Sequence, residues 1–206
     1  MLGLVNKTLQ GFLTDTYGAA CWRQVAQRAG LAHAEFEAML HYDVAITEDV
    51  VAAAETVLDK PRATVLEDAG TYLVSHPNTE ALRRLLRFGG VDFIEFLHSL
   101  DDLPDRARLA VPDLHLPDLE LQDHTGQEFG LLCRGPVDGF GHVLVGGLRA
   151  MADDYGTLVM LEHAGRSAAG ELILITVIDT AFAEGRSFAL GDSGRDSARD
   201  RRGVPT

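Results

Sequence analysis

The chain has 206 residues, 46% of them hydrophobic and 24% charged, which is the composition of an ordinary globular protein of one domain, or of one domain with two lobes. Its formal net charge of −13 argues against nucleic acid and anionic membrane surfaces as partners, because both are bound by clustered Lys and Arg. No apolar stretch approaches the roughly eighteen residues that a membrane span needs. The N-terminus does not have the pattern of a secretory signal, and Cys21 and Cys133 are the only cysteines. We therefore expect a cytoplasmic protein with two reduced thiols.

The first hundred residues carry apolar side chains at the intervals of amphipathic helices. The third helix is expected to begin at Thr47, an N-cap residue type followed by two acids. Pro61 is expected to open the next helix, and Pro77 to end it. The last helix of this part is strongly amphipathic and ends in Leu103. Helices are predicted over 5–17, 19–29, 47–58, 61–76, 79–87 and 93–103.

The second part of the chain has the pattern of a sheet. A connector over 104–117 is expected to be irregular, because prolines recur in it. After Pro117 the apolar period shifts to two, which predicts a strand over 118–122 and a hairpin partner over 129–133. A helix over 140–155 and strands over 158–161 and 172–178 follow. The order predicts an α+β fold: a helical part over 1–103, then a four-stranded antiparallel sheet with one inserted helix over 118–180. Residues 185–206 have the composition of a flexible polar tail.

Similarity to one family extends, in order, over four segments of the chain. These are MLGLVNKTLQGFL with the following YGAACW, then YDVAITEDVVAAAETVL, FIEFLHSLDDLPDRARLAVPDLHLPDLEL and DGFGHVLVGGLRAMADDYGT. Together they resemble haem nitric-oxide/oxygen-binding (H-NOX, HNOB) domains, which include the regulatory haem domain of soluble guanylate cyclase. The resemblance covers about residues 1–178. It implies a stand-alone sensor domain, not an enzyme, that signals to a separate protein such as a cyclase or kinase.

The residues by which this family holds haem are missing from the chain. In the family, a histidine directly after an LD-x-L element binds the haem iron, and the resemblance places Pro104 there. A Y-x-S-x-R motif clamps the haem propionates, and its positions correspond to Cys133, Gly135 and Val137. Proline has no donor atom for iron, and the other three changes remove two hydroxyls and a guanidinium. We therefore expect no haem cofactor and the loss of conventional haem binding.

An apolar crevice between the helical part and the sheet part is the expected ligand site. It is predicted to bind another hydrophobic small molecule and so to shift the angle between the two parts. The residues predicted to line it are Phe93, Leu97, Leu100, Phe140 and Leu144.

Three alternatives stay open. The first is a haem and nitric-oxide sensor with a non-standard iron ligand, either His76 or His98. His98 precedes Pro104 by six residues, which turns its side chain some 120° away from the family's ligand direction. The second is a protein-interaction module whose crevice has filled with side chains. The third is an enzyme acting on a small hydrophobic molecule, although no acid, base or nucleophile has a recognisable arrangement. The paired Cys/His spacing of a metal site is also missing.

Overall fold

Helices form the first part of the chain in the computed structural model, which describes residues 1–187. The helices are α1 Gly3–Tyr17, α2 Ala19–Arg28, α3 Val44–Leu58, α4 Arg62–Ser75, the 3-10 turn η1 Pro77–Thr79, α5 Glu80–Arg87, α6 Phe93–His98 and α7 Leu103–Ala110. The apolar faces of the first four meet in a core that contains Phe12, Leu13, Trp22 and Val50, each at most 5% exposed, whereas α6 packs with the sheet part.

The start of α3 differs from the sequence prediction. Asp43 is the N-cap, and its carboxylate accepts a hydrogen bond from Ala45 N at 2.9 Å. Thr47, the predicted start, lies inside the helix, where it is buried and donates its hydroxyl to Asn6 Oδ1 at 2.7 Å. The prediction was wrong because Asp43, four residues earlier, is also an N-cap residue type, and because Thr47 is instead used in a buried contact with Asn6 of α1.

The helix predicted over 93–103 is divided into α6 and α7. α6 ends at His98, and α7 begins at Leu103 with Pro104 in its first turn. A proline is well accommodated there, because the N–H groups of the first turn have no partner within the helix. Pro104 therefore opens a new helix, and the connector predicted over 104–117 becomes irregular only after Ala110.

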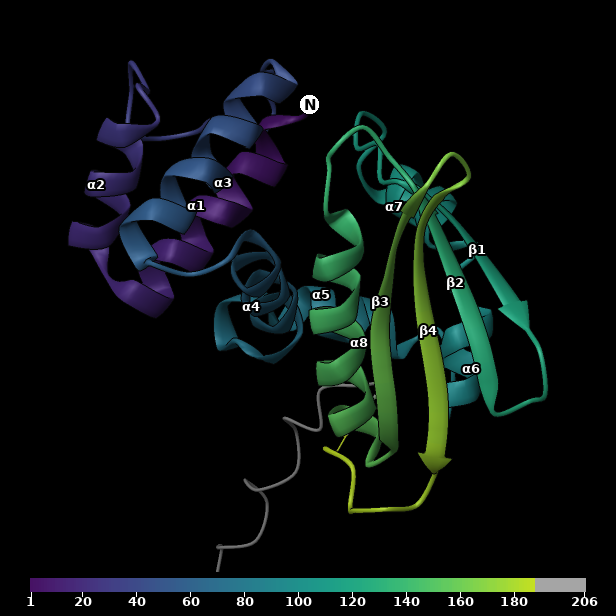
Figure 1. Ribbon diagram of the computed structural model, residues 1–206. Helices are drawn as coiled ribbons and strands as arrows, with labels where there is room; N and C mark the ends of the chain where they lie inside the picture. Colours follow the sequence, from purple (N-terminus) through teal and green to yellow (C-terminus); the bar gives the residue numbers. More distant parts are fainter. Residues whose placement is uncertain (188–206) are drawn as a thin grey trace, which may run out of the picture.

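The sheet part follows the predicted order. β1 Asp118–Asp123, β2 Glu128–Arg134, β3 Leu158–Ser167 and β4 Gly170–Asp179 form an antiparallel sheet in the order β1-β2-β4-β3. The helix α8 Phe140–Tyr155 is inserted between β2 and β3. β3 and β4 are longer than predicted and make a hairpin. The α+β fold is thus confirmed, and α8 lies along one face of the sheet (Figure 1). Ile173, Ile175 and Val177 of β4 are buried in one hydrophobic cluster with residues of α8.

The helical part and the sheet part meet where α4 lies against α8 (Figure 1). Glycines make this crossing close. A Cβ added to Gly70 would lie 2.0 Å from Val143 O, and one added to Gly146 would lie 1.9 Å from Glu67 O. Neither distance is compatible with a side chain, so the two backbones are in direct contact. A larger residue at either position would force the two parts of the molecule apart.

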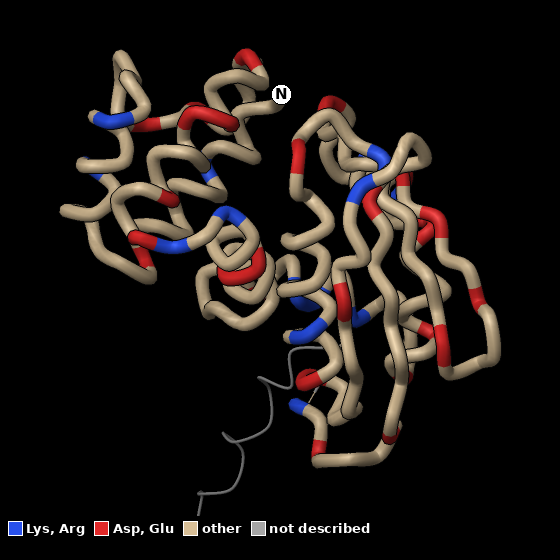
Figure 2. The backbone as a smooth tube through the Cα atoms, viewed as in Figure 1, with Lys and Arg blue, Asp and Glu red and all other residues tan. Residues whose placement is uncertain are grey.

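Acidic and basic residues both occur in the two parts, and one group of basic residues lies around α5 and the adjacent stretch of α8 (Figure 2). Arg83 of α5 is buried there and donates to Asp154 Oδ1 at 2.7 Å. The chain after β4 returns to the same place, because Arg186 N donates to Asp154 O at 2.9 Å. Most of the flexible tail predicted over 185–206 lies outside the described residues. Among residues 1–187, no helix combines the length and the apolar character needed to cross a membrane.

Candidate functional site

The three positions compared with the propionate clamp lie in the segment from β2 to the start of α8. Cys133 and Val137 are buried, at 2% and 8% exposure. Burial, with a smaller contribution from the charge of Glu171, raises the pKa of the Cys133 thiol to about 12, so it is not a reactive thiolate. A Cβ on Gly135 would lie 2.8 Å from Pro117 Cγ. These three positions therefore offer neither a hydroxyl nor a guanidinium, and Pro117 leaves no room for a serine at Gly135. The guanidinium of the neighbouring Arg134 is bound to Glu120 and to the carbonyl oxygen of Ala169.

The two candidate substitute ligands, His98 and His76, each have a partner within the fold. His98 is half exposed, with its Nε2 3.8 Å from Asp123 Oδ2 and its ring edge-on to Phe129. His76 accepts a hydrogen bond at Nδ1 from Asn78 N at 3.2 Å and stacks on Tyr72. Nothing in these contacts distinguishes either imidazole as an iron ligand.

The five residues predicted to line an apolar crevice do come together, but they lie in the hydrophobic core. Phe93, Leu97 and Leu100 are 0–3% exposed, and Phe140 and Leu144 pack against the same cluster. The sheet and α8 contribute further side chains to it, among them Phe129, Leu131, Val145, Leu148 and Met151. A depression of about 390 Å³ lies elsewhere, at the surface between α2 and α3. It is lined by Arg28, Ala29, Gly30, Asp49, Ala52, Ala53 and Thr56.

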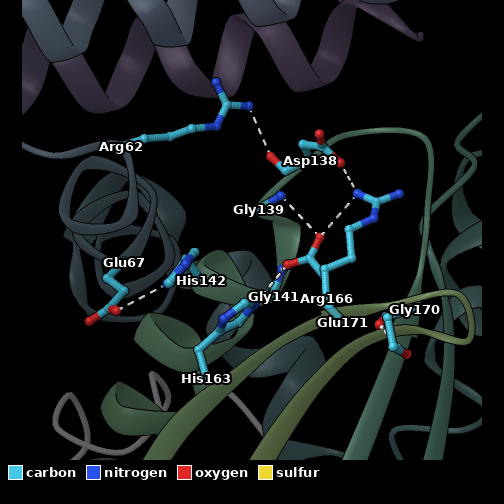
Figure 3. Close-up of polar contacts among 11 residues, drawn as sticks. Arg62, Glu67, Asp138, Gly139, Gly141, His142, His163, Arg166, Gly170 and Glu171 are labelled. Carbon is cyan, nitrogen blue, oxygen red and sulfur yellow. Dashed lines mark hydrogen bonds and ion pairs between the residues drawn. The ribbon is translucent and has the colours of Figure 1, made fainter.

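A buried carboxylate stands at the beginning of α8. Glu171 projects from β4, and its Oε1 accepts a hydrogen bond from Gly139 N at 2.9 Å, while Oε2 accepts one from Gly141 N at 3.0 Å (Figure 3). His163 Nε2 lies 2.9 Å from Oε2, and Arg166 Nη1 lies 3.8 Å from Oε1. Gly139 adopts a φ of 81°, which favours glycine, and a Cβ on Gly141 would lie 2.7 Å from Oε2. Two glycines therefore make this close approach possible.

Opposing effects act on the ionisation of Glu171. Burial by itself raises the pKa of the carboxyl, because the charged form loses its hydration. Hydrogen bonds from His163, Gly141 and Gly139 stabilise the charged form and together outweigh burial, so the pKa lies below its usual value. At neutral pH the site therefore holds a buried carboxylate anion.

A pair of histidines connects this carboxylate to the helical part. The rings of His163 and His142 stack with centroids 4.0 Å apart and planes 22° apart (Figure 3). His142 Nδ1 lies 3.3 Å from Glu67 Oε1 on α4, and Arg149 donates to the other oxygen of Glu67 at 3.2 Å. The chain of contacts from Glu171 to Glu67 thus joins β4, β3, α8 and α4.

Asp138, just before α8, joins the same region to the start of α4. Arg62 donates from Nη2 to Asp138 O at 2.9 Å, and Arg166 forms an ion pair with the Asp138 carboxylate. The whole cluster consists of charge pairs, stacked imidazoles and backbone donors. What it does chemically is hold a carboxylate and align the elements around it.

Sequence reasoning missed Glu171 and the two histidines. Glu171 falls on the same side of β4 as Ile173, Ile175 and Val177, which are buried. A charged residue continuing a buried apolar alternation is a signal that could have been found. The pairing of His142 with His163 had no local signal, because it depends on how α8 packs on the sheet.

The comparisons with known proteins bear on the family and the fold of the chain. The sequence profile of the haem-NO-binding (HNOB) family matches residues 2–163. The chain is 22% identical to soluble guanylate cyclase 89Db of Drosophila melanogaster over 163 residues, which are 79% of this chain and 24% of that protein. It is 23% identical to soluble guanylate cyclase gcy-31 of Caenorhabditis elegans, covering 79% and 23%. The chain thus spans less than a quarter of the length of these curated relatives.

Solved structures match over most of the chain. The Fe(II) unliganded H-NOX protein from K. algicida superposes with a TM-score of 0.74 at 14% identity, covering 89% of this chain and 100% of that one. The H-NOX protein from S. oneidensis in the Fe(II)NO ligation state gives 0.70 at 16% identity, covering 87% and 100%. At such low identities these likenesses establish the fold.

Proposed function

The chain belongs to the haem-NO-binding family, and on that premise we propose that it is an H-NOX-type regulatory domain that works without haem. Its output passes to a separate signalling protein, such as a cyclase or a kinase, and it catalyses no reaction itself. The proposal rests on Pro104, which the sequence resemblance aligns with the family's iron-binding histidine and which lies in the first turn of α7. A proline ring nitrogen in a peptide bond has no lone pair to give to a metal.

Two other features of the region from β2 to the start of α8 do not fit haem. The propionate clamp positions supply no side-chain donor, and the start of α8 already holds the carboxylate of Glu171. A propionate brought against this buried carboxylate would be repelled by it, and a buried charge left unpaired costs several kcal/mol (about 3–5).

The dense packing of the core favours a protein-interaction module and is less compatible with a receptor for a hydrophobic small molecule. A ligand between α6 and α8 would have to displace Phe93, Leu97 and Leu100, which are 0–3% exposed. Protein interiors are packed as densely as organic crystals, so such displacement disrupts many contacts at once. We therefore favour signalling through protein contacts, with the predicted hydrophobic ligand as the alternative.

The test of haem independence is an absorption spectrum of the purified protein, recorded before and after stoichiometric ferrous and ferric haem with nitric oxide. We expect no saturable Soret band at one haem per chain. A sharp band at that ratio would contradict the proposal. The variants His98→Ala and His76→Ala would then identify the substitute ligand by loss of the band.

Native mass spectrometry of the same preparation separates the two remaining forms of the proposal. A module that acts through protein contacts has the mass of the bare chain. A constant added mass that denaturation releases would instead favour the hydrophobic small molecule.

A further inference from the structure

The beginning of α8 is built to receive a carboxylate. The first N–H groups of a helix have no partner within it and lie at the positive end of the helix dipole, so they attract anions. Here the N–H groups of Gly139 and Gly141 each contact a different oxygen of one carboxylate, at 2.9 and 3.0 Å. From β3, His163 Nε2 lies 2.9 Å from one of these oxygens, and Arg166 Nη1 lies 3.8 Å from the other. Donors from two separate elements thus converge on a single anion.

The anion at this site comes from the chain itself. Glu171 pairs directly with Cys133 across β2 and β4, and the segment from Cys133 onward leads to Gly139. A glutamate side chain is two methylene groups and a carboxylate, which is chemically a propionate. Glu171 therefore presents to α8 the same group by which a carboxylate ligand with a flexible arm, such as haem, would be held.

We propose that Glu171 is an internal ligand, which permanently occupies a carboxylate-binding site formed by the start of α8, His163 and Arg166. Self-occupation closes this site to carboxylates from outside and fixes α8 on the sheet without any bound molecule. The inference goes beyond the proposed function, since it concerns how the site is filled and not where the signal goes.

The occupied site also sets the position of α4. His163 contacts Glu171 on one side, and its ring stacks on His142, which in turn contacts Glu67 of α4. Loss of the Glu171 carboxylate removes the anion from one end of this chain of contacts. The first turn of α8 would then be held less firmly against both β4 and α4.

Acetate complementation tests the site directly. Glu171→Ala removes the carboxylate and the methylene that bears it, which together correspond to one acetate ion. We expect the midpoint of thermal unfolding to fall by about 5–10 °C, from the loss of hydrogen bonds to a charged group. Sodium acetate should restore at least half of this loss in a saturable manner, while sodium chloride at the same ionic strength should not.

Two further variants serve as controls. Glu162→Ala removes an exposed carboxylate of β3, and neither a fall in the midpoint nor an effect of acetate is expected. Glu171→Gln keeps the volume of the side chain, so it should be destabilised without a response to acetate. A Glu171→Ala protein that is as stable as the wild type, or that acetate and chloride affect equally, would overturn the inference.

The wild-type protein provides a readout that does not depend on a variant folding. The amide proton shifts of Gly139 and Gly141 should change together during acid titration, because both N–H groups donate to the same carboxylate. Amides that do not respond would also overturn the inference. Haem titration tests the proposed function separately. Acetate rescue together with a Soret band would support the internal ligand and refute haem independence. No acetate rescue and no Soret band would refute the internal ligand and leave haem independence standing.

Discussion

The two ends of α8 each hold a buried carboxylate, and each end does so by different means. At the beginning, Glu171 is held by the N–H groups of Gly139 and Gly141. In the last turn, Asp154 is 1% exposed and is held by guanidinium groups, with Arg83 Nε at 2.7 Å. The polarity of the helix explains the difference. The N-terminal end attracts an anion through its own backbone, whereas the C-terminal end repels it and requires arginines.

The comparison also shows what each carboxylate fastens. Glu171 joins α8 to β4 and, through the stacked histidines, to α4. Asp154 joins α8 to α5 and to the chain after β4, since Arg186 N donates to its carbonyl oxygen. Arg87 adds a second guanidinium 3.5 Å from Asp154 Oδ2 and stacks on the Tyr155 ring at 3.8 Å. One helix is thus fixed at both ends by anions of its own chain.

Removing an arginine that holds Asp154 at the C-terminal end of α8 should reduce the stability of the protein the most. Arg83→Met leaves Asp154 buried with one of its cations removed, and removal of one partner of a buried pair costs about 3–5 kcal/mol of unfolding free energy. Urea denaturation measures the loss. The control is Arg84→Met on the exposed side of α5, expected to change stability by less than about 0.5 kcal/mol. Equal effects of the two variants would refute the role given to Asp154.

In the middle of α8, replacing a glycine by alanine should change the stability of the protein by an amount that depends on which glycine is replaced. Gly146→Ala places a Cβ 1.9 Å from Glu67 O and should destabilise the protein by about 1–3 kcal/mol. Gly147→Ala meets its nearest atom at 3.8 Å, so helix propensity should make it neutral or stabilising by up to about 1 kcal/mol. Denaturant midpoints of the two variants check this order. If Gly146→Ala were the more stable, the close crossing of α4 and α8 would be wrong.

At the N-terminal end of α8, the stability that the Glu171 carboxylate contributes should fall as the pH is lowered. The folded-state pKa of Glu171 lies below the ordinary value of 4.5, so its charge contributes stability above the unfolded-state pKa. That contribution is lost as the pH falls below 4.5 and through the folded-state pKa. The difference in unfolding free energy between wild type and Glu171→Gln should therefore be full at pH 7 and shrink below pH 4.5. A difference that stayed constant down to the lower pKa would contradict the assignment.

The fold could be predicted from the sequence because its signals are local. The shift to a period of two after Pro117 predicted the β1–β2 hairpin, and a helix over 140–155 was predicted where α8 lies. Pro104 was expected to begin an irregular connector, but it lies in the first turn of α7, because a residue type that ends one helix can also start another. Two helices form here because residues 99–102 make a turn between them.

The site could be predicted only in part, because its contacts join distant segments. Apolar periodicity identified Phe93 and Leu97 as inward-facing, but the same pattern describes the wall of a cavity and the interior of a core. Glu171 contacts Gly139, which lies 32 residues earlier in the chain, and His142 contacts His163 only when α8 is packed on the sheet. The spacing of residues along the sequence does not predict such long-range contacts.

A thermal unfolding experiment on protein produced without haem tests the central claim, that this domain is complete without a bound cofactor. A molecule that binds only the folded state raises its stability by about 2.7 kcal/mol at a hundred times its dissociation constant, which for a chain of this size shifts the midpoint by about 5–10 °C. We predict a single cooperative transition whose midpoint is the same with and without added haem. A midpoint that rises with haem in a saturable manner would contradict the account.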